Sequence, residues 1–142
     1  MNIFKRIFAI AITVSLFSIS FSAQTLPAGK WLLISYQFAD KQAKPLEGLK
    51  ITLNVRNNGH LGGSSGCNSY GGSYAVEDGK LKVADIISTM MACEEPSPQF
   101  ERNFFATLSS GTVSKIENSE LTITDPNSRN FLRFVEVKPD PK

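Results

Sequence analysis

The sequence predicts an α+β fold that is mainly β, a curved antiparallel sheet or incomplete barrel with one amphipathic helix. Three observations predict it. Short segments that alternate between apolar and polar residues recur along the chain, with turn residues between them. Glycines gather in the middle of the chain, where strands must bend or bulge. One segment after Pro96 has helical spacing instead, with hairpins before and after it.

The first strands are expected from their composition and alternation. Residues 30–39 read KWLLISYQFA, which is rich in aromatic and β-branched residues. Apolar residues then alternate over 51–55 and lead to Asn58-Gly59, the strongest short hairpin signal. Residues 74–83 repeat this pattern around Asp78-Gly79. Two hairpins are therefore expected in the first two thirds of the chain.

The last strands follow the helix. Residues 114–124 form a third expected hairpin, with its turn at Asn118-Ser119. Residues 130–137 alternate through Phe131, then Phe134 or Val135, then Val137, and would close the sheet. In all, six to eight strands are expected.

The single helix has a start signal, an apolar face and a stop signal. Ser97 can cap its N-terminus, with Pro98 at the first helical position. Gly111 can end it. The residues that fall on its apolar face are Phe100, Phe104, Phe105 and Leu108.

Residues 1–22 have the composition of a secretory signal peptide. Lys5 and Arg6 precede an apolar run that is short for a membrane span, and small residues follow it. The expected cut lies after Ser22, with a cut after residue 23 as the alternative. The mature chain, 23–142, is expected to be one domain located in the periplasm or secreted.

Removal of the leader makes the chain neutral. The full sequence carries 15 Lys and Arg against 13 Asp and Glu, and two of the cations belong to the leader. No basic run remains in the mature part. This balance argues against nucleic acid and against an electrostatic membrane tether, and no transmembrane helix is expected in the mature chain.

Cys67 and Cys93 are the two cysteines of the chain. An even pair in a small exported domain predicts a disulfide bond. The alternatives are two free buried thiols and a Cu(I) site that would add Met90, Met91 and His60 as ligands. Adjacent methionines on a strand point to opposite faces, and core packing accounts for one of them more simply. Neither a metal nor another cofactor is therefore expected.

The segment 62–74, GGSSGCNSYGGSY, contains a G-x-S-x-G pattern. In hydrolases this pattern joins a strand to a helix and needs a downstream acid and histidine. Here a strand-like segment follows it, and the single histidine, His60, lies upstream. A P-loop match also fails, because Gly72 stands where the lysine must be. No catalytic residue is assigned, and the protein is expected not to be an enzyme.

A structural interpretation explains this segment better. Gly66 permits a positive φ, and Gly71 lies where a strand must bend or bulge. Asn68 can bond to nearby backbone groups. Tyr70 and Tyr74 share one face and can fill the core over the bend. On this interpretation the neighbouring serines, Ser64 and Ser65, are dispensable.

The order of these motifs resembles the META domain, the family of the bacterial heat-shock protein HslJ. The segments that carry the resemblance are GKWLLISYQ, GCNSYGGSYAVEDGKLKV, IISTMMAC, the Phe-rich helix and LTITDPNSRNFLRF, which span roughly 28–137. Met90 departs from the family, in which a basic residue is common at that place. Besides the two cysteines, the structural motif residues are Gly66, Asn68, Tyr70, Gly71, Tyr74, Thr89 and Met91.

The resemblance implies a small envelope or secreted protein, linked in some members to heat shock, antibiotic tolerance or motility. It supplies no catalytic residue. The function expected from the sequence is therefore support of the envelope under stress by binding an unidentified envelope protein. The expected contact surface is an exposed sheet edge or the groove beside the 100–108 helix. The alternative is a carrier of an apolar or lipid ligand inside the curved sheet, which would need an internal cavity instead of a filled core.

Overall fold

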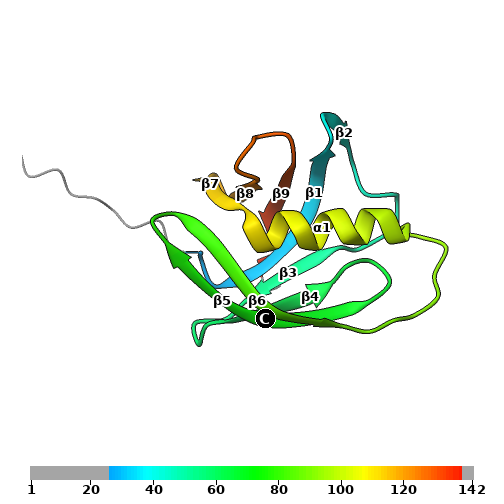
Figure 1. The fold of residues 1–142 in the computed structure, drawn as a ribbon, viewed down its shortest axis with the longest axis horizontal. Helices are drawn as coiled ribbons and strands as arrows, with labels where there is room; N and C mark the ends of the chain where they lie inside the picture. The colour runs from blue at the N-terminus through cyan, green and yellow to red at the C-terminus, as the bar shows by residue number, and fades with distance from the viewer. Residues whose placement is uncertain (1–25, 139–142) are drawn as a thin grey trace, which may run out of the picture.

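The computed structural model describes residues 26–138, so the predicted signal peptide lies outside the described residues. This part of the chain forms nine strands and one helix (Figure 1). The strands are β1 (Gly29–Phe38), β2 (Lys41–Ala43), β3 (Thr52–Val55), β4 (His60–Ser64), β5 (Ser69–Glu77), β6 (Lys80–Ser88), β7 (Thr112–Glu117), β8 (Glu120–Thr124) and β9 (Phe131–Glu136). The helix, α1, spans Pro98–Ser110.

The strands form one antiparallel sheet that closes on itself. The order is β2-β1-β3-β4-β5-β6-β7-β8-β9, and β1 also pairs with β9. Eight strands therefore make a ring, and the short β2 pairs with the far end of β1. The pairing between β6 and β7 is short, and Lys80 lies opposite Thr112 in it. The predicted mainly β, antiparallel fold with one helix is confirmed, and the barrel that was expected to be incomplete is closed by the β1–β9 pairing.

The core lies between the inner face of the sheet and α1. The helix contacts β6, β8 and β9, and in Figure 1 it crosses between β1, β8 and β9 on one side and β4–β6 on the other. Trp31 is 3% exposed, and the rings of Phe104 and Phe105 meet the ring of Tyr70 edge-on at 5.6 and 5.2 Å. The largest fully buried side chains are Phe104, Phe134, Ile51, Leu53, Leu81, Leu108, Leu121, Ile123 and Leu132.

The helix begins where the sequence predicts. The hydroxyl of Ser97 accepts from the backbone N–H of Phe100 at 3.2 Å, and Pro98 occupies the first turn. Gly111 follows the helix, but its φ of −73° is not left-handed. A glycine fits there for another reason, since a Cβ would lie 2.6 Å from the carbonyl oxygen of Thr107.

Two details differ from the sequence expectations. β2 was not expected, because three residues carry too little pattern to indicate a strand. In β9 the inward residues are Leu132 and Phe134, whereas Val137 is exposed. Phe131 is half-buried outside the core, with the Arg133 guanidinium 5.4 Å from its ring centroid. Two adjacent apolar pairs, Phe131-Leu132 and Phe134-Val135, made the register of this strand ambiguous from the sequence.

Candidate functional site

A hydrogen-bond network centred on Asn68 occupies the loop between β4 and β5. Asn68 is 6% exposed. Its Oδ1 accepts from the hydroxyl of Thr89 at 3.0 Å and from the backbone N–H of Met91 at 2.8 Å. Its Nδ2 donates to both carboxylate oxygens of Glu101, at 3.0 and 3.1 Å. One amide side chain therefore joins the loop, the segment after β6 and the first turn of α1.

Ser65 completes this network from the other side. It is fully buried, and its N–H donates to the carbonyl of Asn68 at 2.8 Å. Its hydroxyl lies 2.5 Å from Oε1 of Glu101 and 3.1 Å from the carbonyl oxygen of Asn68. The Glu101 carboxylate thus receives donors from two residues of the loop. Because these groups satisfy one another, the network anchors α1 to the sheet.

A disulfide and a glycine hold the loop next to the network. Cys67 and Cys93 are bonded, with their Cα atoms 6.2 Å apart, inside the usual range for a disulfide. Gly66 has φ of +107°, and a Cβ there would lie 2.8 Å from Cδ of Pro96. The backbone at this position therefore requires glycine.

The predicted motif residues Thr89 and Met91 both bond to Asn68, but Met91 does so through its backbone. Thr89 accepts from the N–H of Ser69 at 3.1 Å as well as donating to Asn68. Met91 contributes its backbone N–H, and its side chain is 62% exposed. Met90 is 96% exposed, so the expectation that core packing accounts for one of the methionines is wrong.

The two tyrosines of β5 brace the sheet through their hydroxyls. Tyr70 is buried and donates to the carbonyl of Thr52 at 2.8 Å. Tyr74 is half-buried against the core and donates to the carbonyl of Arg56 at 3.0 Å. Burial raises the pKa of Tyr70 far above its usual value, so this phenol stays protonated and donates.

Sequence reasoning missed Ser65 and Glu101. Ser65 was expected to be dispensable, yet it is fully buried and bonded at both its hydroxyl and its N–H. Glu101 is not among the site residues predicted from the sequence. The available signal was an acidic residue in the first helical turn, which the helix dipole favours. Its partner in the loop could not be read from spacing.

A shallow hollow lies on the outer face of the sheet, over β4 and β5. Its volume is about 620 Å³. Gly62 and Gly71 are opposite each other in the register and give it a floor without side chains. The polar and apolar side chains around this floor are those of Asn54, Arg56, His60, Ser73, Asp85 and Ile87.

A β-bulge shapes one wall of this hollow. Ser73 pairs with Ala84 and Gly71 pairs with Ile87, so β6 carries one residue more than β5 between them. Asp85, in the bulge, has a φ of +55°. The predicted bend at Gly71 therefore coincides with a bulge in the partner strand. A Cβ at Gly71 itself would lie 3.7 Å from the nearest atom, the carbonyl oxygen of Leu61, which is an ordinary contact.

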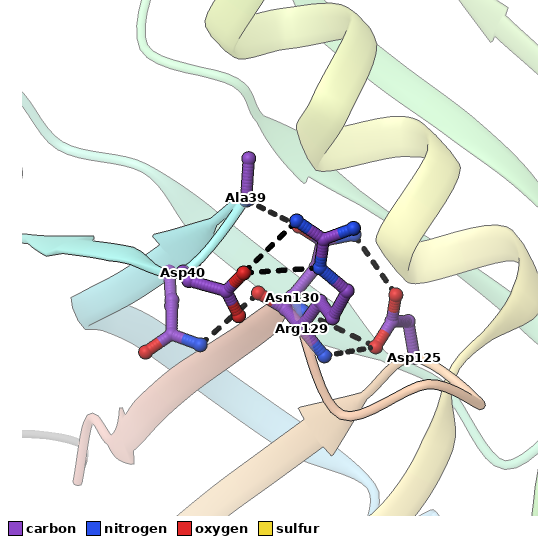
Figure 2. A network of polar contacts seen from close by, with 6 residues as sticks. Ala39, Asp40, Asp125, Arg129 and Asn130 are labelled. Atoms are coloured by element: carbon purple, nitrogen blue, oxygen red, sulfur yellow. Dashed lines mark hydrogen bonds and ion pairs between the residues drawn. The ribbon is translucent and has the colours of Figure 1, made fainter.

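A second polar network joins the β1–β2 turn to the β8–β9 turn (Figure 2). Arg129 contacts Oδ2 of Asp40 through Nε at 3.0 Å and through a terminal nitrogen at 2.9 Å. Asp125 accepts from the N–H groups of Arg129 and Asn130 at 2.9 and 3.1 Å, and from Nδ2 of Asn130 at 2.9 Å. Asn130 accepts from the N–H of Ala39 at 2.8 Å. The side chains of Asp40, Asp125 and Asn130 bond within and between the two turns, which points to a structural role.

Residues 26–138 contain neither a metal-binding cluster nor a membrane-spanning helix. This part of the chain holds no group of three or more His, Cys, Asp or Glu side chains placed to share an ion. No helix within it has the length and apolar character needed to span a bilayer.

Comparison with known proteins identifies the family. The sequence profile of the META domain matches residues 24–138. The chain belongs to the META domain family. The matched range includes the glycine-rich loop, the disulfide and both polar networks. The resemblance drawn from the sequence motifs is confirmed over nearly the same residues.

Solved structures share the fold. The chain is similar to a protein from Burkholderia xenovorans solved by NMR, with 28% identity and a TM-score of 0.67 over 96% of this chain and 100% of the other. A second NMR structure matches with 16% identity and a TM-score of 0.59, over 76% and 88% of the two chains. A crystal structure of a DUF4847 family protein from Bacteroides vulgatus matches with 11% identity and a TM-score of 0.57, over 80% and 95%. The last two show the fold alone.

A search of curated proteins found no match. The comparisons therefore show the family and the fold.

Proposed function

We propose that this META domain is exported and acts as a non-catalytic binding protein that supports the bacterial envelope under stress. One observation carries the proposal. Both serines of the catalytic-looking pattern are bonded within the loop. Ser64, at the serine position of the pattern, accepts from the backbone N–H of Gly66 at 3.1 Å. Ser65 is fully buried and bonds to Glu101 and Asn68 within the Asn68 network, so its hydroxyl serves the fold and is closed to a substrate. His60, exposed on β4, takes no part in that network.

Export is supported by the disulfide. Cys67 and Cys93 are bonded, and disulfides persist mainly in oxidising compartments such as the periplasm or the exterior. The sequence of residues 1–22, with Lys5 and Arg6 before an apolar run, also indicates export. The proposed location is therefore the periplasm or outside the cell.

Binding rather than carriage of a lipid inside the barrel is supported by the packing of the core. Phe104, Phe134 and Leu108 are fully buried and fill the space between the sheet and α1. Tyr70 packs against Phe104 and Phe105 in the same space. An apolar ligand would have to displace these side chains, whereas a partner on the outer surface displaces only water.

A deletion strain tests the proposed function. The strain is expected to become more sensitive to heat or to large apolar antibiotics, and the full-length gene is expected to restore growth. A matched gene that lacks residues 1–22 keeps the domain in the cytoplasm and is expected not to restore it. Equal rescue by both genes would contradict export as the basis of the function.

A chemical probe tests the absence of catalysis. A serine-directed fluorophosphonate is expected to leave the folded protein unlabelled at Ser64 and Ser65, and Ser64→Ala and Ser65→Ala are the matched controls. Specific labelling of either serine that its own variant abolishes would establish a reactive serine and overturn the non-catalytic assignment.

A further inference from the structure

We infer that the hollow over β4 and β5 is a binding site for a planar aromatic acid. The aromatic ring would lie over the glycine floor, with its acid group at Arg56 and His60. The inference rests on the proposed function in the sense that it names a ligand class for a binding domain. It concerns the outer face of the sheet, away from the Asn68 network and from the core.

The floor of the hollow is a row of the sheet that lacks side chains at its centre. The register runs from Asn54 on β3 to Gly62, to Gly71, and to Ile87 on β6. Two glycines therefore face each other across β4 and β5, and the flanking side chains stand about 14 Å apart, three strand spacings. In β-sheets an aromatic ring commonly covers such a glycine from a neighbouring strand. Here the nearest neighbours of a Cβ built on Gly62 or Gly71 are backbone atoms, and no ring atom is among them.

One wall of the hollow is apolar. Ile87 lies at the end of this row and is 76% exposed. A branched aliphatic side chain this exposed gains free energy when a ring packs against it, because apolar area leaves water. The ring would contact the peptide planes of Gly62 and Gly71 with its face and Ile87 with its edge. The volume of about 620 Å³ is within the range of small-molecule sites.

The rim of the hollow has charges of opposite sign on opposite sides. Arg56 and His60 border it on the β3–β4 side, and Asp85 borders it on β6. Within residues 26–138, no ion pair or side-chain hydrogen bond occupies these three side chains. Arg56 can therefore form a charge-assisted, two-pronged bond to a carboxylate. Asp85 repels an acid from the other side, so the ligand has one favoured orientation.

Of the two glycines in the floor, Gly71 is the one at which a side chain can be added to test the site. A Cβ on Gly62 would lie 2.6 Å from the carbonyl oxygen of Tyr70, so substitution there disturbs the sheet. Gly71 has no such conflict, since its nearest contact would be an ordinary 3.7 Å. A side chain at Gly71 would fill the hollow while leaving the strands in register. Valine suits this purpose, because it favours strands.

The direct experiment is an NMR titration of the oxidised, ¹⁵N-labelled protein with 2-naphthoate. We expect saturable shifts centred on the amides of Gly62, Gly71 and Ile87. Cyclohexanecarboxylate keeps the charge without the flat ring, and 2-naphthamide keeps the ring without the charge. Both are expected to bind about tenfold more weakly or worse, because each loses one of the two contacts.

Variants then assign the contacts. Gly71→Val is expected to abolish saturable binding, and Arg56→Gln to weaken it about tenfold. The matched controls are Ala75→Val, exposed on the same strand outside the hollow, and Arg102→Gln, exposed on α1. Both controls are expected to bind as the unmodified protein does. Arg56 is exposed, so its variant keeps the test decisive even where Gly71→Val fails to fold.

Three results would overturn the inference. The first is a set of shifts centred on α1 or scattered over the surface. The second is equal binding by cyclohexanecarboxylate, or by glucuronate, an acid that also lacks a flat ring. The third is unchanged affinity in Gly71→Val or Arg56→Gln. A domain that rescues the deletion strain but binds no naphthoate overturns the ligand class alone. A domain that binds naphthoate but fails to rescue the strain overturns the stress role and leaves the site standing.

Discussion

Asn68 and Glu101 lie 33 residues apart in the sequence, and the amide of Asn68 donates to both carboxylate oxygens of Glu101. The same amide accepts two further bonds from Thr89 and Met91 through its oxygen. The side-chain amide of Asn68 thus makes four hydrogen bonds, which join the loop, the segment after β6 and the first turn of α1. The loop between β4 and β5 is therefore fixed by side-chain hydrogen bonds, although it has no regular structure.

The first prediction concerns the amide of Asn68. Asn68→Ala is expected to lower the free energy of unfolding by about 1–3 kcal/mol, because it leaves buried donors unpaired. Asn68→Asp is expected to cost more, since it places a carboxylate against Glu101. Urea unfolding followed by the fluorescence of Trp31, the single tryptophan, measures both. Asn57→Ala, at an exposed turn, is the control and should stay within about 0.5 kcal/mol.

The second prediction separates two adjacent serines. Ser65→Ala is expected to destabilise by about 1–2 kcal/mol, because Glu101 and the loop lose a buried donor. Ser64→Ala removes only an acceptor for the N–H of Gly66 and should stay within about 0.5 kcal/mol. The same urea titration measures both variants. Equal values for the two serines would mean that the buried bond of Ser65 contributes nothing beyond the half-buried bond of Ser64.

The strands and the helix could be predicted from the sequence because their signals are local. Asn58-Gly59 and Asp78-Gly79 mark turns that join paired strands in the structure. Ser97 and Pro98 mark the helix start through bonds within one turn. Each of these signals needs only a few neighbouring residues, so no knowledge of the fold is required.

The partners of the loop could not be predicted in the same way. Glu101 meets Ser65 and Asn68 only because α1 lies across the sheet, and this contact joins residues that share no local pattern. Met91 was recognised as a motif residue, yet its backbone rather than its side chain makes the contact. The hollow depends on the cross-strand register of Gly62 and Gly71, which the pairing of β4 with β5 across the 65–68 loop sets. Contacts of this kind follow from tertiary packing.

The third prediction concerns the disulfide. Cys93→Ser and Cys67→Ser are each expected to lower the free energy of unfolding by about 2–4 kcal/mol, because the unfolded chain regains the freedom of the closed loop. The double variant should cost no more than either single one, since one bond is lost in every case. Adding a reductant to the unmodified protein should reproduce the loss. Two free thiols that react with an alkylating agent in the native protein would contradict the bond.

The fourth prediction compares two glycines of the same segment. Gly66→Ala is expected to destabilise by about 2–4 kcal/mol, because φ is +107° and the new Cβ meets Pro96. Gly71→Ala should change stability by less than about 1 kcal/mol, since its Cβ has room. Thermal unfolding of both variants measures the difference. Similar losses at the two positions would mean that the glycines act through the flexibility of the unfolded chain alone.

The last prediction is a pH dependence carried by Tyr70. Burial raises the pKa of this phenol in the folded protein, while in the unfolded chain it stays near 10. Above about pH 10 the unfolded chain releases a proton that the folded protein keeps, so stability falls as pH rises, by up to about 1.4 kcal/mol per pH unit.

Tyr70→Phe removes this component of the slope and costs about 1 kcal/mol near neutral pH, because the bond to the carbonyl of Thr52 is lost. The test is urea unfolding of both proteins between about pH 8 and pH 11. Lysine titration affects the two chains alike and cancels in the difference between them. The two plots of unfolding free energy against pH should therefore converge as pH rises. The unmodified protein loses stability when the phenol ionises in its unfolded chain, and the phenylalanine variant has no phenol to ionise. Curves that stay parallel above about pH 10 would show that the Tyr70 phenol ionises as readily in the fold as in the unfolded chain.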